Sequence, residues 1–287
     1  MRKECFVRKY LDIGAALVLA PVLATGVGAV GVPSAKADGV PTAPSLRAGA
    51  PHRVLPRSPS RPLDTARLAA GINPTVGRLE YDNPDTPGKV GVCAAAAVRS
   101  DNRNLIVTAG HCMSKGGANL KYKNVKFWPG ATQSDPAPFG VFEAFRSNAV
   151  RAWGIEGDER YDFGFVNLKP NYKGQRLGDV VGENGLSVNE SYVAQRTVIS
   201  YPVPLRIQKE CFGETRPFLP APESRVRINC DFPKGSSGGP WLKDYDASTR
   251  LGLINGVISH VARDASFNLS PYFDDAIWEQ YQRSATY

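Results

Sequence analysis

Three features of this chain of 287 residues predict an all-β fold. From Val76 onward, short runs rich in apolar and β-branched residues recur. Clusters of Gly, Pro, Asn and Asp separate these runs at short spacing, which is typical of an antiparallel sandwich or barrel. Helical periodicity is confined to the C-terminus, where Pro271 can start a helix behind Ser270. The expected strands include residues 90–98, 104–108, 125–128, 161–168, 191–201, 225–229 and 251–261.

The first 37 residues have the pattern of a secretory signal peptide. Basic residues are followed by an apolar run over 13–32 and by Ala35-Lys36-Ala37, so cleavage is expected after Ala37. The alternative is a retained membrane anchor, because roughly 20 apolar residues can span a bilayer. The cleavage site, Pro21 and four glycines in the run favour the signal peptide. We therefore expect a secreted, extracellular protein that has no membrane contact after signal removal.

Residues 38–77 are predicted to be flexible. They hold seven prolines and five arginines without a sustained apolar period, so they bury too little surface to offset the entropy of ordering. They form either a pro-segment or a linker, and we favour the pro-segment because nothing folded is predicted before them. The folded domain is expected over residues 78–287.

The charge distribution argues against nucleic acid as a partner. The formal net charge is +8, but residues 1–37 and 38–77 each contain five Lys or Arg against two acidic residues. Only two of the eight excess positive charges therefore lie in the last 210 residues. Because a nucleic-acid-binding face needs cations gathered on the folded domain, no such function is predicted.

The cysteines support export. Cys5 lies in the signal peptide, and the remaining four predict two disulfides. The sequence alone permits three pairings; nearest-neighbour pairing closes two loops of 20 residues, each worth about 3 kcal/mol. A zinc site is disfavoured, since no cysteine pair has the short ligand spacing and the three histidines are scattered. No metal and no other cofactor are expected. The four cysteines are Cys93, Cys112, Cys211 and Cys230.

Three short motifs contain the residue types that acyl transfer requires. Residues 108–112 (Thr-Ala-Gly-His-Cys) follow one apolar run, Asp162 precedes another, and residues 235–240 (Gly-Ser-Ser-Gly-Gly-Pro) place two serines between glycines. Acyl transfer needs a nucleophile, a base of near-neutral pKa, a carboxylate that orients the base, and N–H groups aimed at the oxyanion. Glycines in the last motif allow backbone angles that expose a serine and align neighbouring amides.

These motifs resemble those of chymotrypsin-like serine peptidases. Residues 108–112 are similar to the family's histidine motif and residues 235–240 to its serine motif, in the family's order His, Asp, Ser. The resemblance runs from about Val76 to the C-terminus and is greatest to secreted bacterial trypsin-like members, whose Cys-Asp-x-x-x-Gly-Ser-Ser-Gly-Gly-Pro-Trp is similar to residues 230–241. It implies two six-stranded antiparallel β-barrels with a C-terminal helix. It also implies a secreted serine endopeptidase that acts on polypeptide substrates, and we expect this protein to be a monomer.

The resemblance assigns a role to each candidate residue. Ser237 would be the nucleophile, His111 the general base and acid, and Asp162 the carboxylate that holds the imidazole tautomer. The amides of Gly235 and Ser237 would form the oxyanion hole. Ser259 matches the family's serine that donates a hydrogen bond to the catalytic aspartate.

Two of these roles have rivals. Asp158 lies four residues before Asp162, but an aspartate that precedes an apolar strand is a poor structural choice, which favours Asp162. Ser236 is the rival nucleophile, but the glycine pattern puts Ser237 two residues after Gly235. Ser236 also replaces the aspartate that captures the new N-terminus in animal members, so activation by that ion pair lacks its partner here.

The resemblance also bears on the disulfides and on specificity. Cys93 with Cys112 matches the family's disulfide at the histidine loop, and the loop spacing then favours Cys211 with Cys230. Asp231 stands where trypsin-like members keep a pocket carboxylate that pairs with Arg or Lys; the alternative is a structural residue with internal hydrogen bonds. Val261 stands where a glycine is usual, and its side chain would favour small residues instead. Ile258 replaces the histidine of glutamate-specific members, and His260 either borders the substrate cleft or is merely exposed. The candidate pocket residues are Asp231, Ser259 and Val261.

Two other functions fit part of the pattern. A catalytically inactive, peptidase-like binding protein would keep the same motifs. An esterase of the α/β-hydrolase type would use residues 235–239 as its nucleophile elbow, but it needs an aspartate and a histidine after the serine and leaves residues 108–112 unexplained.

Overall fold

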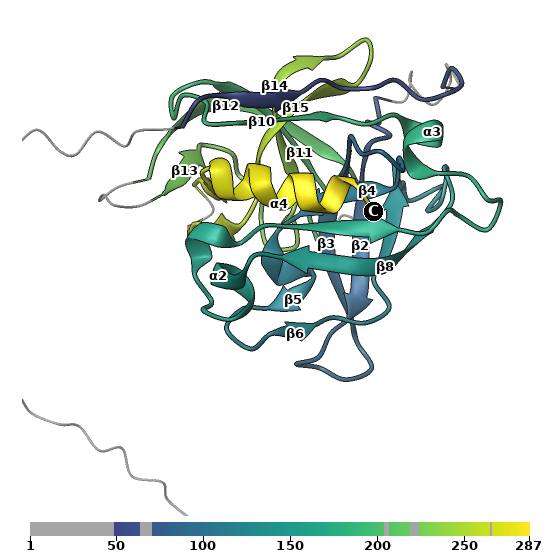
Figure 1. The fold of residues 1–287 in the computed structure, drawn as a ribbon, viewed down its shortest axis with the longest axis horizontal. Helices are drawn as coiled ribbons and strands as arrows, with labels where there is room; N and C mark the ends of the chain where they lie inside the picture. The colour runs from purple at the N-terminus through teal and green to yellow at the C-terminus, as the bar shows by residue number, and fades with distance from the viewer. Residues whose placement is uncertain (1–48, 64–70, 204–206, 219–223, 265) are drawn as a thin grey trace, which may run out of the picture. The chain divides into compact units, whose positions relative to one another are not determined.

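The computed structural model describes residues 49–63, 71–203, 207–218, 224–264 and 266–287, all within the compact unit Arg47–Tyr287 (Figure 1). The expected signal peptide, residues 1–37, and its cleavage site lie outside the described residues. Within the described ranges, no helix is long and apolar enough to cross a membrane.

The first half of the unit is a closed antiparallel barrel of six strands, in the order β2-β3-β4-β9-β8-β7. Its central strand β3 contains four consecutive alanines and is almost wholly buried. Because alternate residues of a strand face opposite sides, Ala95 joins the cluster drawn from the barrel strands, whereas Ala94 and Ala96 join a cluster shared with the second sheet. The strands are β2 (Val76–Asp82), β3 (Val90–Val98), β4 (Leu105–Thr108), β7 (Lys126–Pro129), β8 (Phe142–Ala149) and β9 (Gly164–Leu168).

The second half is a nine-stranded sheet, in the order β1-β10-β15-β14-β11-β12-β13-β17-β16. Among its strand pairs in the described residues, β10–β15 is the parallel one. The all-β fold with a C-terminal helix is confirmed, but the second sheet has nine strands rather than six, partly because β1 extends one edge. The strands are β1 (His52–Val54), β10 (Gly185–Val188), β11 (Gln195–Ser200), β12 (Lys209–Pro217), β13 (Arg225–Ile228), β14 (Pro240–Asp246), β15 (Leu251–Val257), β16 (His260–Val261) and β17 (Asn268–Pro271).

The C-terminal helix α4 (Asp275–Ala285) begins later than expected. Pro271 ends strand β17 rather than starting the helix, and the Asp274 side chain accepts a hydrogen bond from the Ala276 N–H as the N-cap. Ile277 and Tyr281 pack into the cluster that both halves share. The short elements are η1 (Gly110–Cys112), β5 (Ser114–Lys115), β6 (Leu120–Lys121), α2 (Arg151–Gly154), η2 (Glu159–Tyr161) and α3 (Leu177–Val181).

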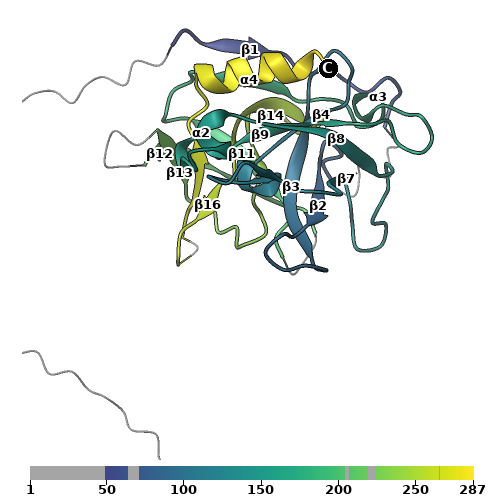
Figure 2. The same cartoon turned by 60° about the horizontal axis from the view of Figure 1, so that its bottom comes forward.

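Residues 49–63, which we call the N-terminal strap, correct the expectation that residues 38–77 are flexible. Strand β1 pairs with β10 and runs beside α4 (Figure 2). His52 stacks on Trp278 of α4, with ring centroids 5.3 Å apart. Arg57 forms a 2.6 Å ion pair with Glu183, whose side chain is only 1% exposed. A buried carboxylate needs a cationic partner, and Arg57 provides one for Glu183. The composition of residues 38–77 does not reveal this ion pair. Residues 38–48 and 64–70 lie outside the described residues.

Both expected disulfides are present. Cys93 of β3 pairs with Cys112 of η1, and Cys211 of β12 pairs with Cys230, which follows β13. The first bond ties the histidine segment to the barrel wall, and the second ties together neighbouring strands of the second sheet.

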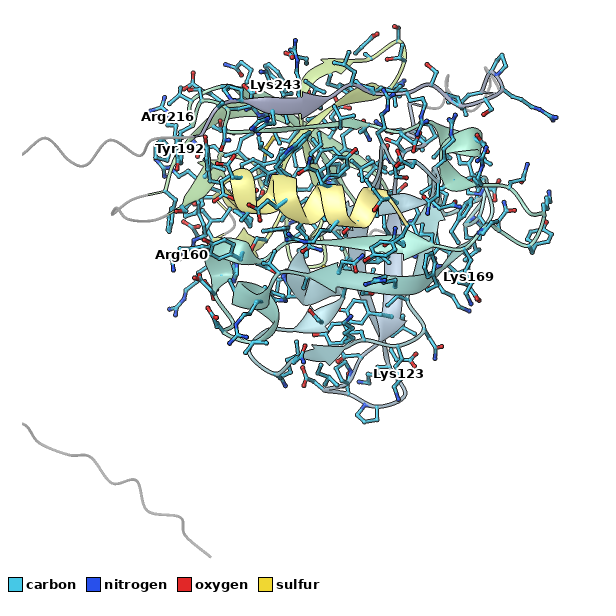
Figure 3. All side chains as sticks on the ribbon, viewed as in Figure 1. Lys123, Arg160, Lys169, Tyr192, Arg216 and Lys243 are labelled. Carbon is cyan, nitrogen blue, oxygen red and sulfur yellow. A yellow bond between two sulfur atoms is a disulfide. The ribbon has the colours of Figure 1, made fainter. Side chains whose placement is uncertain are left out.

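Basic side chains are spread around the described part of the chain. Figure 3 shows Lys123, Lys169 and Arg216 at widely separated positions.

Candidate active site

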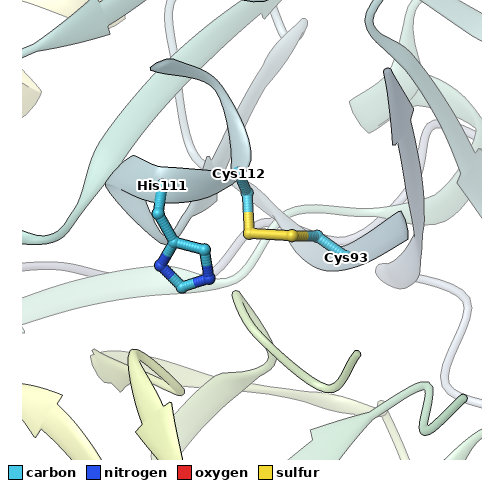
Figure 4. A group of neighbouring side chains, drawn as sticks. All are labelled: Cys93, His111 and Cys112. Atoms are coloured by element: carbon cyan, nitrogen blue, oxygen red, sulfur yellow. A yellow bond between two sulfur atoms is a disulfide. The ribbon is translucent and has the colours of Figure 1, made fainter. Parts of the chain in front are cut away.

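His111 lies in η1, directly after the fully buried strand β4. Its neighbour Cys112 forms a disulfide with Cys93 (Figure 4). Strand β4 before His111 and the disulfide after it therefore both hold this segment in place. The ligand atoms of Cys93, His111 and Cys112 lie within 4.8 Å of one another, a spacing compatible with a metal ion. However, both sulfurs belong to the disulfide and are not thiolates, so this group does not define a metal site.

Asp162 lies between η2 and β9 and is completely buried. Its Oδ2 atom lies 2.7 Å from His111 Nδ1, and its Oδ1 atom accepts the backbone N–H of His111 at 2.7 Å. Ser259 Oγ donates a third hydrogen bond to Oδ2 at 2.6 Å. The carboxylate is therefore paired on both oxygens, as a buried charge requires.

The contact between Asp162 and His111 shifts the pKa values of both side chains. Burial is the largest influence on His111 and opposes its protonation, but the charge of Asp162 and its hydrogen bond outweigh burial and raise the pKa of His111. Burial likewise opposes ionisation of Asp162, yet His111 and the Ser259 hydrogen bond hold the pKa of this carboxyl below its usual value. The imidazole itself is 32% exposed, so it can meet a substrate.

Ser237 lies in the turn before β14. Gly235 and Gly238 flank it with φ angles of +88° and +83°, in the left-handed region that favours glycine. The Ser237 carbonyl accepts the Ala94 N–H at 2.7 Å, and the Gly238 N–H donates to Ile258 O at 2.7 Å. The turn is thus bonded to the first barrel and to the second half, where Ser200 Oγ of β11 also donates to the Ser236 carbonyl at 2.7 Å.

The two serines of the turn differ in accessibility. Ser236 is fully buried, and its hydroxyl has no hydrogen-bond partner in the described part of the chain. Ser237 lines a cleft of about 380 Å³ together with His111, although among the described residues no hydrogen bond joins Ser237 Oγ to the imidazole. Within the same described ranges, the backbone N–H groups of Gly235 and Ser237 are not taken up by other hydrogen bonds. Ser237 is therefore the serine that a bound molecule can reach.

The cleft brings together residues from distant segments. Ser259 and Val261 line it, as the resemblance implies, and so does His260, for which the sequence left two interpretations open. Trp153 and Glu159 line it too, and the Trp153 ring lies 6.5 Å from the His111 ring. Sequence reasoning missed these two, because neither belongs to a motif and only the fold of the α2–η2 segment brings them to the cleft. The remaining lining residues are Gly116, Gly157, Lys234 and Gly235.

Asp231 does not occupy the position expected for a pocket carboxylate. It is exposed and does not line the cleft, whereas the next residue, Phe232, is 3% exposed and packs with Ile258. Asn268 Nδ2 donates to the Phe232 carbonyl at 3.0 Å and holds the segment in this register. Both neighbours of Asp231 are buried, Cys230 with 2% and Phe232 with 3% exposure, and Asp231 between them faces outward. The expectation of a buried Asp231 carboxylate is therefore wrong.

Comparisons with known proteins agree with this architecture. The structure of protease Anisep from Arthrobacter nicotinovorans is similar with a TM-score of 0.68 and 26% identity, over 80% of this chain and 99% of that one. A thermostable serine protease, AL20, from an extremophilic microorganism has a TM-score of 0.68 and 24% identity, over 74% and 97%. A Glu endopeptidase has a TM-score of 0.60 and 16% identity, over 81% and 97%. No protein-family model and no curated protein matches the chain.

The chain therefore has the chymotrypsin-like fold that the motifs implied, and its structural neighbours are serine proteases. The similarity to protease Anisep supports a protease function for this chain as well.

Proposed function

We propose that this protein is a secreted serine endopeptidase that hydrolyses polypeptides through an acyl-enzyme on Ser237. The observation that carries the proposal is the contact between His111 Nδ1 and the buried carboxylate of Asp162 at 2.7 Å, in a cleft that Ser237 shares. Asp162 accepts the Nδ1 hydrogen, which leaves Nε2 as the basic nitrogen.

These positions support a reaction in two steps, acylation and deacylation of Ser237. His111 Nε2 takes the hydroxyl proton as Ser237 Oγ attacks the peptide carbonyl, and the N–H groups of Gly235 and Ser237 receive the negative charge on the carbonyl oxygen. When the tetrahedral species collapses, the C–N bond breaks and His111 gives its proton to the leaving amine. Water then repeats the sequence on the ester, and Ser237 is restored.

The test is covalent labelling by a fluorophosphonate together with peptide hydrolysis. Ser237→Ala should abolish labelling and reduce kcat/KM by several orders of magnitude, leaving about 10³–10⁴ over water from oxyanion and binding contributions. Ser236→Ala is the matched control and should keep both signals. Labelling and hydrolysis that persist in Ser237→Ala would overturn the proposal.

The rivals predict different outcomes. A catalytically inactive binding protein would show no labelling of Ser237 in the folded wild-type chain. An esterase would label but would cleave ester substrates and leave peptides intact. The all-β fold already argues against the α/β-hydrolase form of that alternative.

We also propose that the mature protein is extracellular and monomeric, and that residues 1–37 are removed at export. Any removed pro-segment ends before the N-terminal strap, because the strap forms part of the second sheet. Cleavage-site profiling on a mixed peptide library decides the primary specificity. N-terminal sequencing of the exported chain tests the boundary.

A further inference from the structure

The hydroxyl of Ser259 lies between two groups that compete for its single hydrogen. Ser259 Oγ lies 2.6 Å from Asp162 Oδ2 on one side and 2.8 Å from His260 Nδ1 on the other. Ser259 is only 4% exposed, so little water is available to replace either partner. The two contacts therefore have to be satisfied together.

Counting hydrogens fixes the direction of both bonds. An ionised carboxylate only accepts, so the Ser259 hydrogen points to Asp162. The oxygen of Ser259 then accepts, and His260 Nδ1 must carry a hydrogen and donate it. In the reverse arrangement the Ser259 oxygen would face the carboxylate without a hydrogen, and a buried carboxylate oxygen would lose a partner.

His260 is held in the orientation that this donation needs. Its backbone lies in β16, where it pairs with Leu269 of β17. Its second nitrogen, Nε2, faces Glu159 Oε1 at 3.5 Å, and Glu159 Oε2 accepts a hydrogen bond from Arg225 at 3.0 Å. Backbone pairing in β16 and the contact of Nδ1 with Ser259 thus place the ring, and Nε2 lies on the side of Glu159.

We propose that His260 is a positioning residue for the catalytic pair, an inference that rests on the proposed function. The Nδ1–H of His260 donates to the Ser259 oxygen and so keeps the Ser259 hydroxyl hydrogen directed at Asp162 Oδ2. Asp162 in turn orients His111. Glu159, which accepts a hydrogen bond from Arg225, lies 3.5 Å from His260 Nε2 on the side of the ring away from Ser259. The ring of His260 also borders the cleft, so the test has to separate positioning from substrate contact.

Two amide replacements make the matched comparison. In His260→Asn the side-chain nitrogen stands as many bonds from Cα as Nδ1 and can still donate to Ser259. In His260→Gln the nitrogen stands where Nε2 was. We expect His260→Asn to keep kcat near the wild-type value and His260→Gln to lower it about five- to tenfold, the range of one lost hydrogen bond. Equal kcat values for the two amide variants would overturn the proposal.

A double-mutant cycle tests whether His260 acts through Ser259. His260→Phe keeps a ring at the cleft but removes the donor, so it should lower kcat more than it raises KM. In a Ser259→Ala background the same change should have no further effect on kcat, because the hydroxyl to be oriented is gone. A full effect of His260→Phe in both backgrounds would show that His260 only shapes the cleft.

The third histidine provides the control for the substitution itself. His52→Phe keeps the stack on Trp278, lies in β1, and should leave kcat and KM unchanged. Failure of the proposed function looks different from failure of this inference: it appears as an inactive wild type or an active Ser237→Ala. If His260→Phe does not fold, as judged by circular dichroism, the comparison of the two amide variants decides.

Discussion

Ala94 donates its backbone N–H to the Ser237 carbonyl at 2.7 Å, so a residue of the first barrel holds the serine turn of the second sheet. Cys93, the residue before it, is bonded to Cys112 beside His111. One strand, β3, therefore fixes both the proposed nucleophile and the proposed base, and the distance between them depends on this strand.

Gly238→Ala is expected to break this arrangement. A Cβ atom at Gly238 would lie 2.1 Å from Ala94 O and 2.2 Å from Thr108 Oγ1, at a φ of +83°. Gly88→Ala is the matched control, because Gly88 has the same φ but no atom within 4 Å of the added Cβ. We expect the control to cost about 1 kcal/mol of unfolding free energy and to keep full activity. Gly238→Ala should lose both stability and kcat; equal behaviour of the two variants in urea unfolding and peptide hydrolysis would contradict this.

The pH dependence of kcat/KM should reflect the raised pKa of His111. The base must be neutral, so activity falls as the pH drops through that pKa, and the acid limb should lie above the ordinary histidine value of about 6.5. Asp162→Asn removes the charge and the ionic hydrogen bond that raise the pKa, and it leaves burial, which lowers it. The acid limb should therefore move to lower pH while kcat falls by about 10⁴. If the acid limb of the Asp162→Asn variant lies at the same pH as that of the wild type, Asp162 does not set the pKa of His111.

The two disulfides should have equal effects on stability but different effects on activity. Both join cysteines 19 residues apart, so removing either should cost about 3 kcal/mol in the chain-entropy model. Replacing Cys93 and Cys112 by alanine frees the segment beside His111 and should also lower kcat. Replacing Cys211 and Cys230 should leave kcat of the folded protein nearly unchanged. Thermal unfolding and kcat measured on both double variants check this, and an equal loss of kcat would contradict it.

The N-terminal strap should contribute to stability. Arg57→Met leaves the buried Glu183 carboxylate with Arg103 at 3.6 Å as its remaining charged partner, and we expect a loss of about 2 kcal/mol. Arg151→Met is the control. Arg151 and Glu156 form an ion pair in which both side chains are exposed, and such a pair contributes little to the free energy of unfolding. A chain that starts at Val76 should be less stable still, since it also loses β1. If that shortened chain unfolds at the same urea concentration as the longer one, the strap is dispensable.

The sequence by itself determined the residues of the proposed chemistry and the class of fold, and it limited the two disulfides to three possible pairings. Residues 108–112 and 235–240 are local patterns, in which the neighbours of His111 and Ser237 set the backbone that each needs. Loop lengths of the cysteine pairs are also local quantities. Such features can be recognised in the sequence because few backbone conformations satisfy them.

Only the tertiary structure decided which residues surround that chemistry. Composition suggested that residues 49–63 would be flexible, yet a buried carboxylate 126 residues from Arg57 gives them a partner. Motif position placed Asp231 in a pocket, but Phe232 takes the inward place because it packs with Ile258. The contact of His260 with Ser259 is likewise invisible in a list of residues. Burial and hydrogen-bond partners are set by segments distant in sequence, and a change of one residue in register reverses which side chain faces inward.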